Sequence, residues 1–102
     1  MSNSEINHGL PIEAVNAINK VFKQDPNIEK VILYGSRAKG NYRASSDIDL
    51  CLEGQALTLK DLLAIENQLD DLLLPWEIDL SLKHQIDNPK LLGHIKSVGI
   101  VL

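Results

Sequence analysis

Segments with helical periodicity alternate along the whole chain with short β-rich segments, and this alternation is the feature that most constrains the fold. Helices are predicted over 11–24, 58–73 and 89–97, with a short helical turn over 36–40; strands are predicted over 28–34, 47–53, 76–82 and 100–102. The order α-β-α-β-α-β-α-β favours one sheet covered by helices. The predicted fold class is therefore α/β in the broad sense (α+β), a mixed β-sheet flanked by helices, in a single domain of residues 1–102.

Helix-capping residues set several of these boundaries. Pro11 suits the first helical position. Thr58 with Asp61 three residues later has the pattern of a capping box, and Asn88-Pro89 has that of an N-cap followed by a first helical residue. Only about a dozen residues, without a long helix, separate the first two strands, which is short for a parallel crossover. An antiparallel pair is expected there.

The charge of the chain limits its partners. The formal net charge is −4 and only 4% of residues are aromatic. An acidic chain is poorly suited to general nucleic-acid binding, and a base-stacking platform needs aromatic rings, so no direct nucleic-acid contact is expected. The bases of residues 30–46, with no acid among them, indicate either a phosphate-binding segment beside a metal ion or a solvated loop; they are Lys30, Arg37, Lys39 and Arg43.

The chain has one cysteine, Cys51, so neither an internal disulfide nor a multi-cysteine zinc site is possible within it. Cys51 either borders the candidate site or is a small buried hydrophobe. The first ten residues lack the basic and apolar regions of a signal peptide, and no apolar run is long enough to span a membrane. A cytoplasmic location without membrane contact is expected.

Three aspartates form the candidate chemical centre. Asp47 and Asp49 alternate with apolar residues on one predicted strand, so their side chains leave the same face, and Asp79 has the same setting on another strand. If the strands are neighbours, three carboxylates converge and repel one another unless a cation lies between them. Carboxylate oxygens suit Mg²⁺. The alternative is an ordinary solvated strand face, and Glu77 is the alternative third carboxylate.

Gly35-Ser36 stands where a strand ends and a helical turn begins. Gly35 permits a sharp bend and the close approach of a ligand, and Ser36 offers a hydroxyl at the start of the turn. Arg37 and Lys39 could meet a triphosphate. The alternative is a plain turn in which Ser36 is the helix N-cap, and the segment is not a Walker A loop because no Gly-Lys-Ser/Thr follows.

The three histidines are scattered along the chain. His8, His84 and His94 lack metal-ligand spacing and are expected to be exposed or capping. Tyr34 is assigned to the core and Trp76 to the core or an interface, whereas Tyr42 lies in a predicted loop and could touch a nucleotide.

The motif as a whole resembles the nucleotidyltransferase superfamily of DNA polymerase β. Gly35-Ser36, the gap 37–46 and Asp47-Ile48-Asp49-Leu50 are similar to its minimal nucleotidyltransferase branch, and 74–80 looks like the strand of its third carboxylate. The resemblance implies a polymerase β-like fold and roles in catalysis and in binding two Mg²⁺ for Asp47, Asp49 and Asp79. It also implies ATP as substrate, with Gly35 and Ser36 at its phosphates.

The resemblance further implies a partner. Larger members carry a second domain for the acceptor, and this chain leaves little room for one after Asp79. In the minimal branch, a separate all-helical HEPN toxin fills that place and is adenylylated on a tyrosine, so an antitoxin role is implied. Two other hypotheses stay open: a binding module that neutralises a helical partner without catalysis, and a small-molecule adenylyltransferase subunit.

Overall fold

The computed structural model describes residues 8–102, so most of the segment that lacks signal-peptide features lies outside the described residues. Each predicted helix and strand is present, with ends shifted by a few residues. The elements are α1 (Ile12–Phe22), β1 (Lys30–Tyr34), α2 (Ser36–Lys39), β2 (Ile48–Glu53), α3 (Leu59–Asp70), β3 (Ile78–Leu82), η2 (Lys83–Gln85), α4 (Pro89–Val98) and β4 (Ile100–Val101). The short 3₁₀ helix η2 was not predicted.

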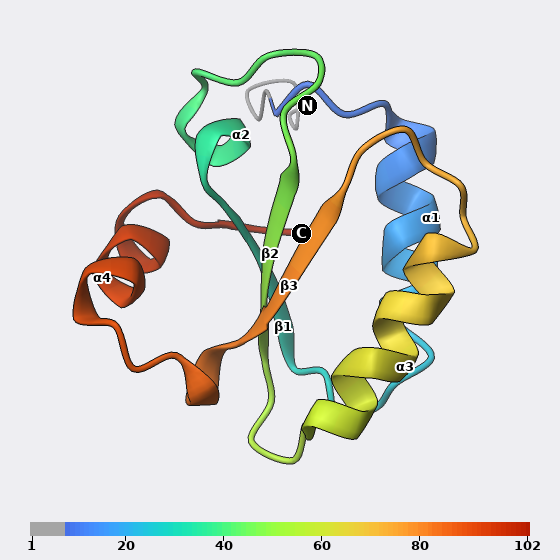
Figure 1. Ribbon diagram of the computed structural model, residues 1–102, viewed down its shortest axis with the longest axis vertical. Helices are drawn as coiled ribbons and strands as arrows, with labels where there is room; N and C mark the ends of the chain where they lie inside the picture. Colours follow the sequence, from blue (N-terminus) through green and yellow to red (C-terminus); the bar gives the residue numbers. More distant parts are fainter. Residues whose placement is uncertain (1–7) are drawn as a thin grey trace.

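The four strands form one mixed sheet in the order β3-β2-β1-β4. β1 is antiparallel to β2, as the short connection predicted, and it is also antiparallel to β4. β2 and β3 are parallel neighbours, joined through α3. The helices α1 and α3 cover one face of the sheet and α4 covers the other (Figure 1). The predicted fold class, a mixed sheet flanked by helices, is therefore confirmed.

The period-two pattern of β2 decides which side chains enter which half of the core. Ile48, Leu50 and Leu52 are fully buried in the larger cluster, which α1 and α3 complete. Cys51 points to the other face, where it is buried in a smaller cluster with Ile32, Tyr34 and Ile95. Cys51 is thus a small buried hydrophobe, and Tyr34 belongs to the core as predicted.

The predicted caps of α3 and α4 are present, whereas Pro11, predicted as the first helical residue, has extended backbone and is the N-cap of α1. Thr58 Oγ1 accepts a hydrogen bond from the Asp61 N–H at 3.2 Å, and Asp61 Oδ2 accepts one from the Thr58 N–H at 3.0 Å. Asn88 Oδ1 accepts from the N–H of Lys90 at 2.9 Å. These bonds satisfy N–H groups that the first turn of a helix leaves without partners, and they fix where α3 and α4 begin.

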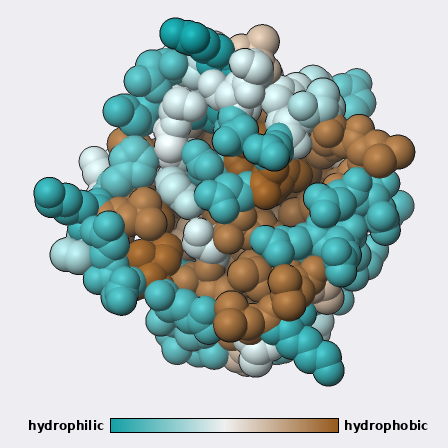
Figure 2. All heavy atoms as spheres, viewed as in Figure 1, coloured by the Kyte–Doolittle hydropathy of each residue, from teal (hydrophilic) through white to brown (hydrophobic). Residues whose placement is uncertain are grey.

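No helix among residues 8–102 is both long and apolar enough to cross a membrane. The view in Figure 2 shows hydrophobic residues in patches between hydrophilic ones on this face of the molecule.

Candidate active site

The chain turns at Gly35, between β1 and α2, against the carboxylate of Asp49. Gly35 has φ 77° and ψ −157°, a conformation that is essentially restricted to glycine. A Cβ on Gly35 would collide with Oδ2 of Asp49. Gly35 occupies the N-cap position of α2 and Ser36 is the first helical residue, so the alternative of Ser36 as N-cap is wrong. Only glycine fits this approach of backbone to carboxylate.

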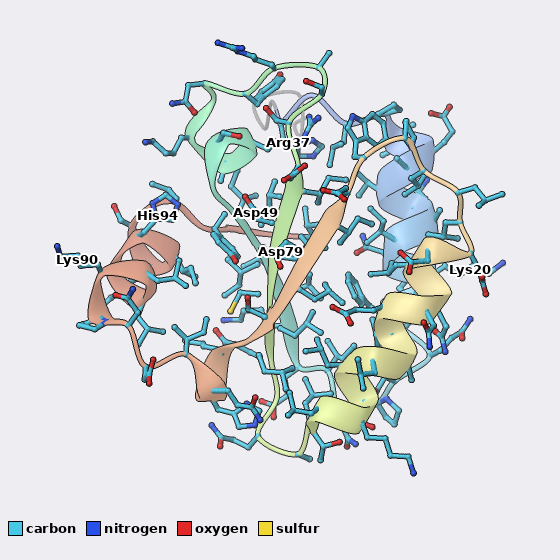
Figure 3. All side chains as sticks on the ribbon, viewed as in Figure 1. Lys20, Arg37, Asp49, Asp79, Lys90 and His94 are labelled. Atoms are coloured by element: carbon cyan, nitrogen blue, oxygen red, sulfur yellow. The ribbon has the colours of Figure 1, made fainter. Side chains whose placement is uncertain are left out.

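The parallel pairing of β2 with β3 brings the predicted carboxylates together. Asp49 is the register partner of Asp79, and Asp47 lies one residue before β2 begins at Ile48. Asp49 is half-buried, whereas Asp47 and Asp79 are exposed. Figure 3 shows Asp49 and Asp79 at neighbouring positions on the two strands. The sheet therefore presents two adjacent carboxylates beside the Gly35 turn, with a third at the start of β2.

Burial raises the pKa of Asp49 above its usual value, and the negative charges of Asp79 and Asp47 raise it further, while His94 opposes them. A carboxylate in this setting gains from a nearby cation. Among residues 8–102, no group of three carboxylate, histidine or cysteine side chains is gathered closely enough to enclose a metal ion. Mg²⁺ does not require such a cage, because it commonly uses one or two carboxylates together with substrate phosphates and water. The oxygen donors present fit that ion.

An open cavity of about 480 Å³ adjoins the exposed carboxylates. Its wall combines acids with apolar side chains at the edge strand β3 and the end of α3: Asp47, Asp70, Leu74, Trp76, Glu77, Ile78 and Asp79. Glu77 precedes β3, and its carbonyl accepts the Ile48 N–H at 2.9 Å. The register partner of Asp49 is Asp79 and not Glu77. The pairing thus favours Asp79 as the third carboxylate and leaves Glu77 on the cavity wall.

The bases predicted to meet a triphosphate have different environments. Lys39 is exposed at the end of α2. Arg37 is 1% exposed, and its guanidinium donates to backbone carbonyls. Burial lowers the pKa of Arg37, an effect that the neighbouring Tyr42 opposes. The predicted phosphate contact of Arg37 does not fit this burial. The sequence could not reveal the burial, because charge pattern alone does not distinguish a solvated arginine from a buried one.

His94 is a residue of the site that the sequence did not reveal. It lies on α4, and its Nε2 accepts the Gly35 N–H at 3.1 Å. Its ring also meets the Tyr34 ring edge-on, with centroids 6.1 Å apart. His94 is therefore half-buried and not exposed, and its bond to the N-cap residue of α2 agrees with the capping alternative. It lies 59 residues from Gly35 along the chain, and no local pattern marks a contact of that kind.

His8 and the aromatic residues make structural contacts, whereas His84 is exposed as predicted. His8 Nδ1 accepts the Leu10 N–H at 3.1 Å; because Leu10 precedes the N-cap Pro11, this bond lies in the turn before α1 and is not a helix cap. Tyr34 shares a hydrogen bond of 3.4 Å with Ser81. Tyr42 and Trp76 both pack against the Arg37 guanidinium. The assignment of Trp76 to the core or an interface agrees with its half-buried ring.

A carboxylate pair on neighbouring strands beside a Gly-Ser turn, on a mixed sheet flanked by helices, is the arrangement of a nucleotidyltransferase. Residues 16–102 match the family described as "Polymerase beta, Nucleotidyltransferase". The chain belongs to this family of nucleotidyltransferases, enzymes whose substrates are nucleotides.

Relatives within the family agree with the match. Two proteins of Methanocaldococcus jannaschii, each named "Putative protein adenylyltransferase", are 31% identical to this chain over 78 residues, which are 76% of this chain and 79% of theirs.

Solved structures share the fold at lower identity. A toxin-antitoxin crystal structure with AMP-PNP has a TM-score of 0.70 and 22% identity, over 84% of this chain and 69% of that one. A complex of tri-AMPylated Shewanella oneidensis HEPN toxin with its MNT antitoxin has a TM-score of 0.60 and 18% identity, over 86% of this chain and 70% of that one.

Proposed function

We propose that the chain transfers AMP from ATP to a tyrosine hydroxyl of a helical HEPN-type partner, with release of pyrophosphate, and so acts as an antitoxin. Asp47, Asp49 and Asp79 would hold two Mg²⁺ ions, with the transfer taking place in the cytoplasm. The observation that carries this proposal is the register of Asp49 with Asp79 on parallel strands, directly against the Gly35 turn. The relatives named as protein adenylyltransferases support a protein as the acceptor.

Each polar group has a distinct task in this proposal. Mg²⁺, when bound, supplies positive charge to the transferring phosphate and orients its oxygens. Gly35 lets the triphosphate approach the backbone, and Ser36 and exposed Lys39 bind its oxygens. Asp79 faces the open cavity, so the incoming hydroxyl would transfer its proton to Asp79 or close to it. Arg37 is left out of the phosphate-binding set because its side chain is buried.

The cavity beside Asp79 is a suitable entry for an acceptor carried by another protein. It is open to solvent and large enough for a tyrosyl side chain, with Trp76 and Leu74 as apolar walls. Leu73, next to this wall, is 88% exposed. A protruding apolar residue at the rim of the cavity suits contact with a partner protein.

The test is transfer of label from nucleotide to partner. The purified chain is incubated with Mg²⁺ and each α-³²P-labelled NTP, with and without the protein encoded beside it. Label on the partner with ATP alone, lost in the Asp47→Asn/Asp49→Asn variant, supports the proposal. Circular dichroism of that variant verifies that the fold is retained.

Other outcomes would contradict the proposal. Neutralisation of the partner by the Asn variant without any NTP would identify a non-catalytic binding module. Label on a small molecule but on no protein would identify a small-molecule adenylyltransferase. Full transfer by the Asn variant would exclude Asp47 and Asp49 as catalytic residues.

A further inference from the structure

Arg37 is the only charged side chain that is buried among residues 8–102. Its guanidinium donates three hydrogen bonds to main-chain carbonyls: Nε to Ser46 at 3.1 Å, one terminal nitrogen to His8 at 2.8 Å and the other to Ala44 at 3.2 Å. A buried cation with neutral acceptors is stable only if its donors are satisfied. The burial of Arg37 therefore depends on the path of these backbone segments.

Two aromatic rings complete the surroundings of Arg37. The guanidinium carbon lies 5.3 Å from the ring centroid of Tyr42 and 5.5 Å from that of Trp76, within the range of cation–π attraction. The Trp76 indole N–H donates to the Ala44 carbonyl at 2.8 Å, so Trp76 and Arg37 share one acceptor. Arg37, the 41–47 loop and the entry to β3 are thus joined in one network.

Both ends of this network lie close in sequence to carboxylates of the site. The Ser46 carbonyl belongs to the peptide bond that precedes Asp47, so its bond to Arg37 fixes the plane from which Asp47 extends. Trp76 leads into β3, which carries Asp79 three residues later. A planar guanidinium suits this task, because its donors diverge in fixed directions whereas a lysine ammonium is a single point charge.

We propose that Arg37 is a positioning residue, which holds the 41–47 loop and the start of β3 so that Asp47 and Asp79 are placed for metal binding, and which does not contact the triphosphate. The inference rests on the proposed function, in which Asp47 and Asp79 are metal ligands. It assigns the basic residues of α2 to separate tasks: Lys39 to phosphate and Arg37 to the geometry of the carboxylates.

The experiment compares Arg37→Met and Arg37→Lys with Lys39→Met, and uses Lys20→Met on the exposed face of α1 as a charge-matched control. Three quantities are measured: acrylamide quenching of Trp76, the sole tryptophan; the Mn²⁺ dissociation constant, from the electron paramagnetic resonance of free Mn²⁺; and kcat and KM for ATP. The first two require no transfer reaction, and the first requires neither metal nor nucleotide.

If Arg37 positions the carboxylates, Arg37→Met increases the quenching of Trp76 and raises the Mn²⁺ dissociation constant. It also lowers kcat by about 10- to 100-fold, the size of effect that a small misplacement produces, with KM for ATP nearly unchanged. In Arg37→Lys, the quenching, the Mn²⁺ dissociation constant and kcat lie between the values of Arg37→Met and the wild type. Lys39→Met should do the opposite: it raises KM for ATP and leaves Trp76 quenching and Mn²⁺ binding as in the wild type.

The proposal is overturned if Arg37→Met raises KM for ATP while Trp76 quenching and Mn²⁺ affinity stay at wild-type values, since that is the behaviour of a phosphate ligand. If Arg37→Met does not fold, the folded Arg37→Lys variant decides, and wild-type values in all three measurements would refute a role for the guanidinium. Absence of transfer in the wild type would refute the proposed function alone, because quenching and Mn²⁺ binding still test Arg37.

Discussion

At position 35, both the backbone conformation and the space available for a side chain require glycine. Its φ and ψ lie where other residues are strained, and the Asp49 carboxylate occupies the place of a Cβ. Gly35→Ala is therefore expected to destabilise the fold by about 1–3 kcal/mol and to displace Asp49. Urea unfolding gives the first quantity, and loss of transferase activity reports the second.

Gly93 is a matched control for that substitution. It lies within α4, where the backbone is helical and an added Cβ would meet nothing within 4 Å beyond the helix's own backbone. Gly93→Ala should stabilise the protein by roughly 0.5–1 kcal/mol, because alanine is the better helix former. If both alanine variants lose the same stability, collision with Asp49 is not what restricts position 35 to glycine.

Asp49 makes stability depend on pH. Its pKa in the folded chain is raised above 3.8 by burial and by Asp79 and Asp47, so the folded state binds the proton more tightly than the unfolded state. The associated stability is present at low pH and is lost as pH rises from near 3.8 through the raised folded-state value. In EDTA, wild-type protein should lose more stability over this window than Asp49→Asn, which cannot ionise. Parallel profiles of unfolding free energy against pH would refute this interpretation.

At the scale of elements, the caps are the best-predicted features, because a cap is local. Thr58 and Asp61 are three residues apart, and their two hydrogen bonds require only the first turn of α3. Contacts between distant elements could not be predicted in this way. His94 reaches Gly35 from α4, and the acceptors of Arg37 are main-chain carbonyls, which no residue type marks in a sequence. The carboxylates were predictable; the groups that hold them in place were not.

The capping box of α3 allows a test of stability apart from function. Thr58→Ala removes one bond of the box and should lower the free energy of unfolding by about 1 kcal/mol, whereas Thr58→Ser should keep most of it. Activity should be unaffected, since α3 begins at the end of the sheet opposite Asp49 and Asp79 (Figures 1 and 3). Urea denaturation and transfer assays measure the two effects, and a large loss of activity in Thr58→Ala would argue against their separation.

At the scale of the whole molecule, alternation of helices and strands predicted the mixed sheet, and the short β1–β2 connection predicted its antiparallel pair. The sequence did not predict that β2 and β3 are parallel neighbours. The convergence of the carboxylates was predicted only on the condition that their strands are adjacent. This adjacency is decided by the packing of α3 across the face that Leu50 and Leu80 share. Once that packing exists, the register alone sets Asp49 beside Asp79. The site is thus a product of the fold's topology, built from residues that the motif identifies.

Because the carboxylates repel one another without a cation, ligand binding should stabilise the whole domain. Mg²⁺ with a non-hydrolysable ATP analogue is expected to raise Tm, and EDTA should reverse the rise. At a free ligand concentration about 100 times Kd, the free energy of unfolding increases by about 2.7 kcal/mol. The Asp47→Asn/Asp49→Asn variant should show little of this shift, while NaCl of equal ionic strength controls for charge screening. If the variant and the wild type are stabilised equally, the ion acts on the general negative charge of the chain and not at the aspartates. A shift confined to the wild type would instead tie the stability of the fold to Asp47 and Asp49, two of the side chains that are proposed to carry the chemistry.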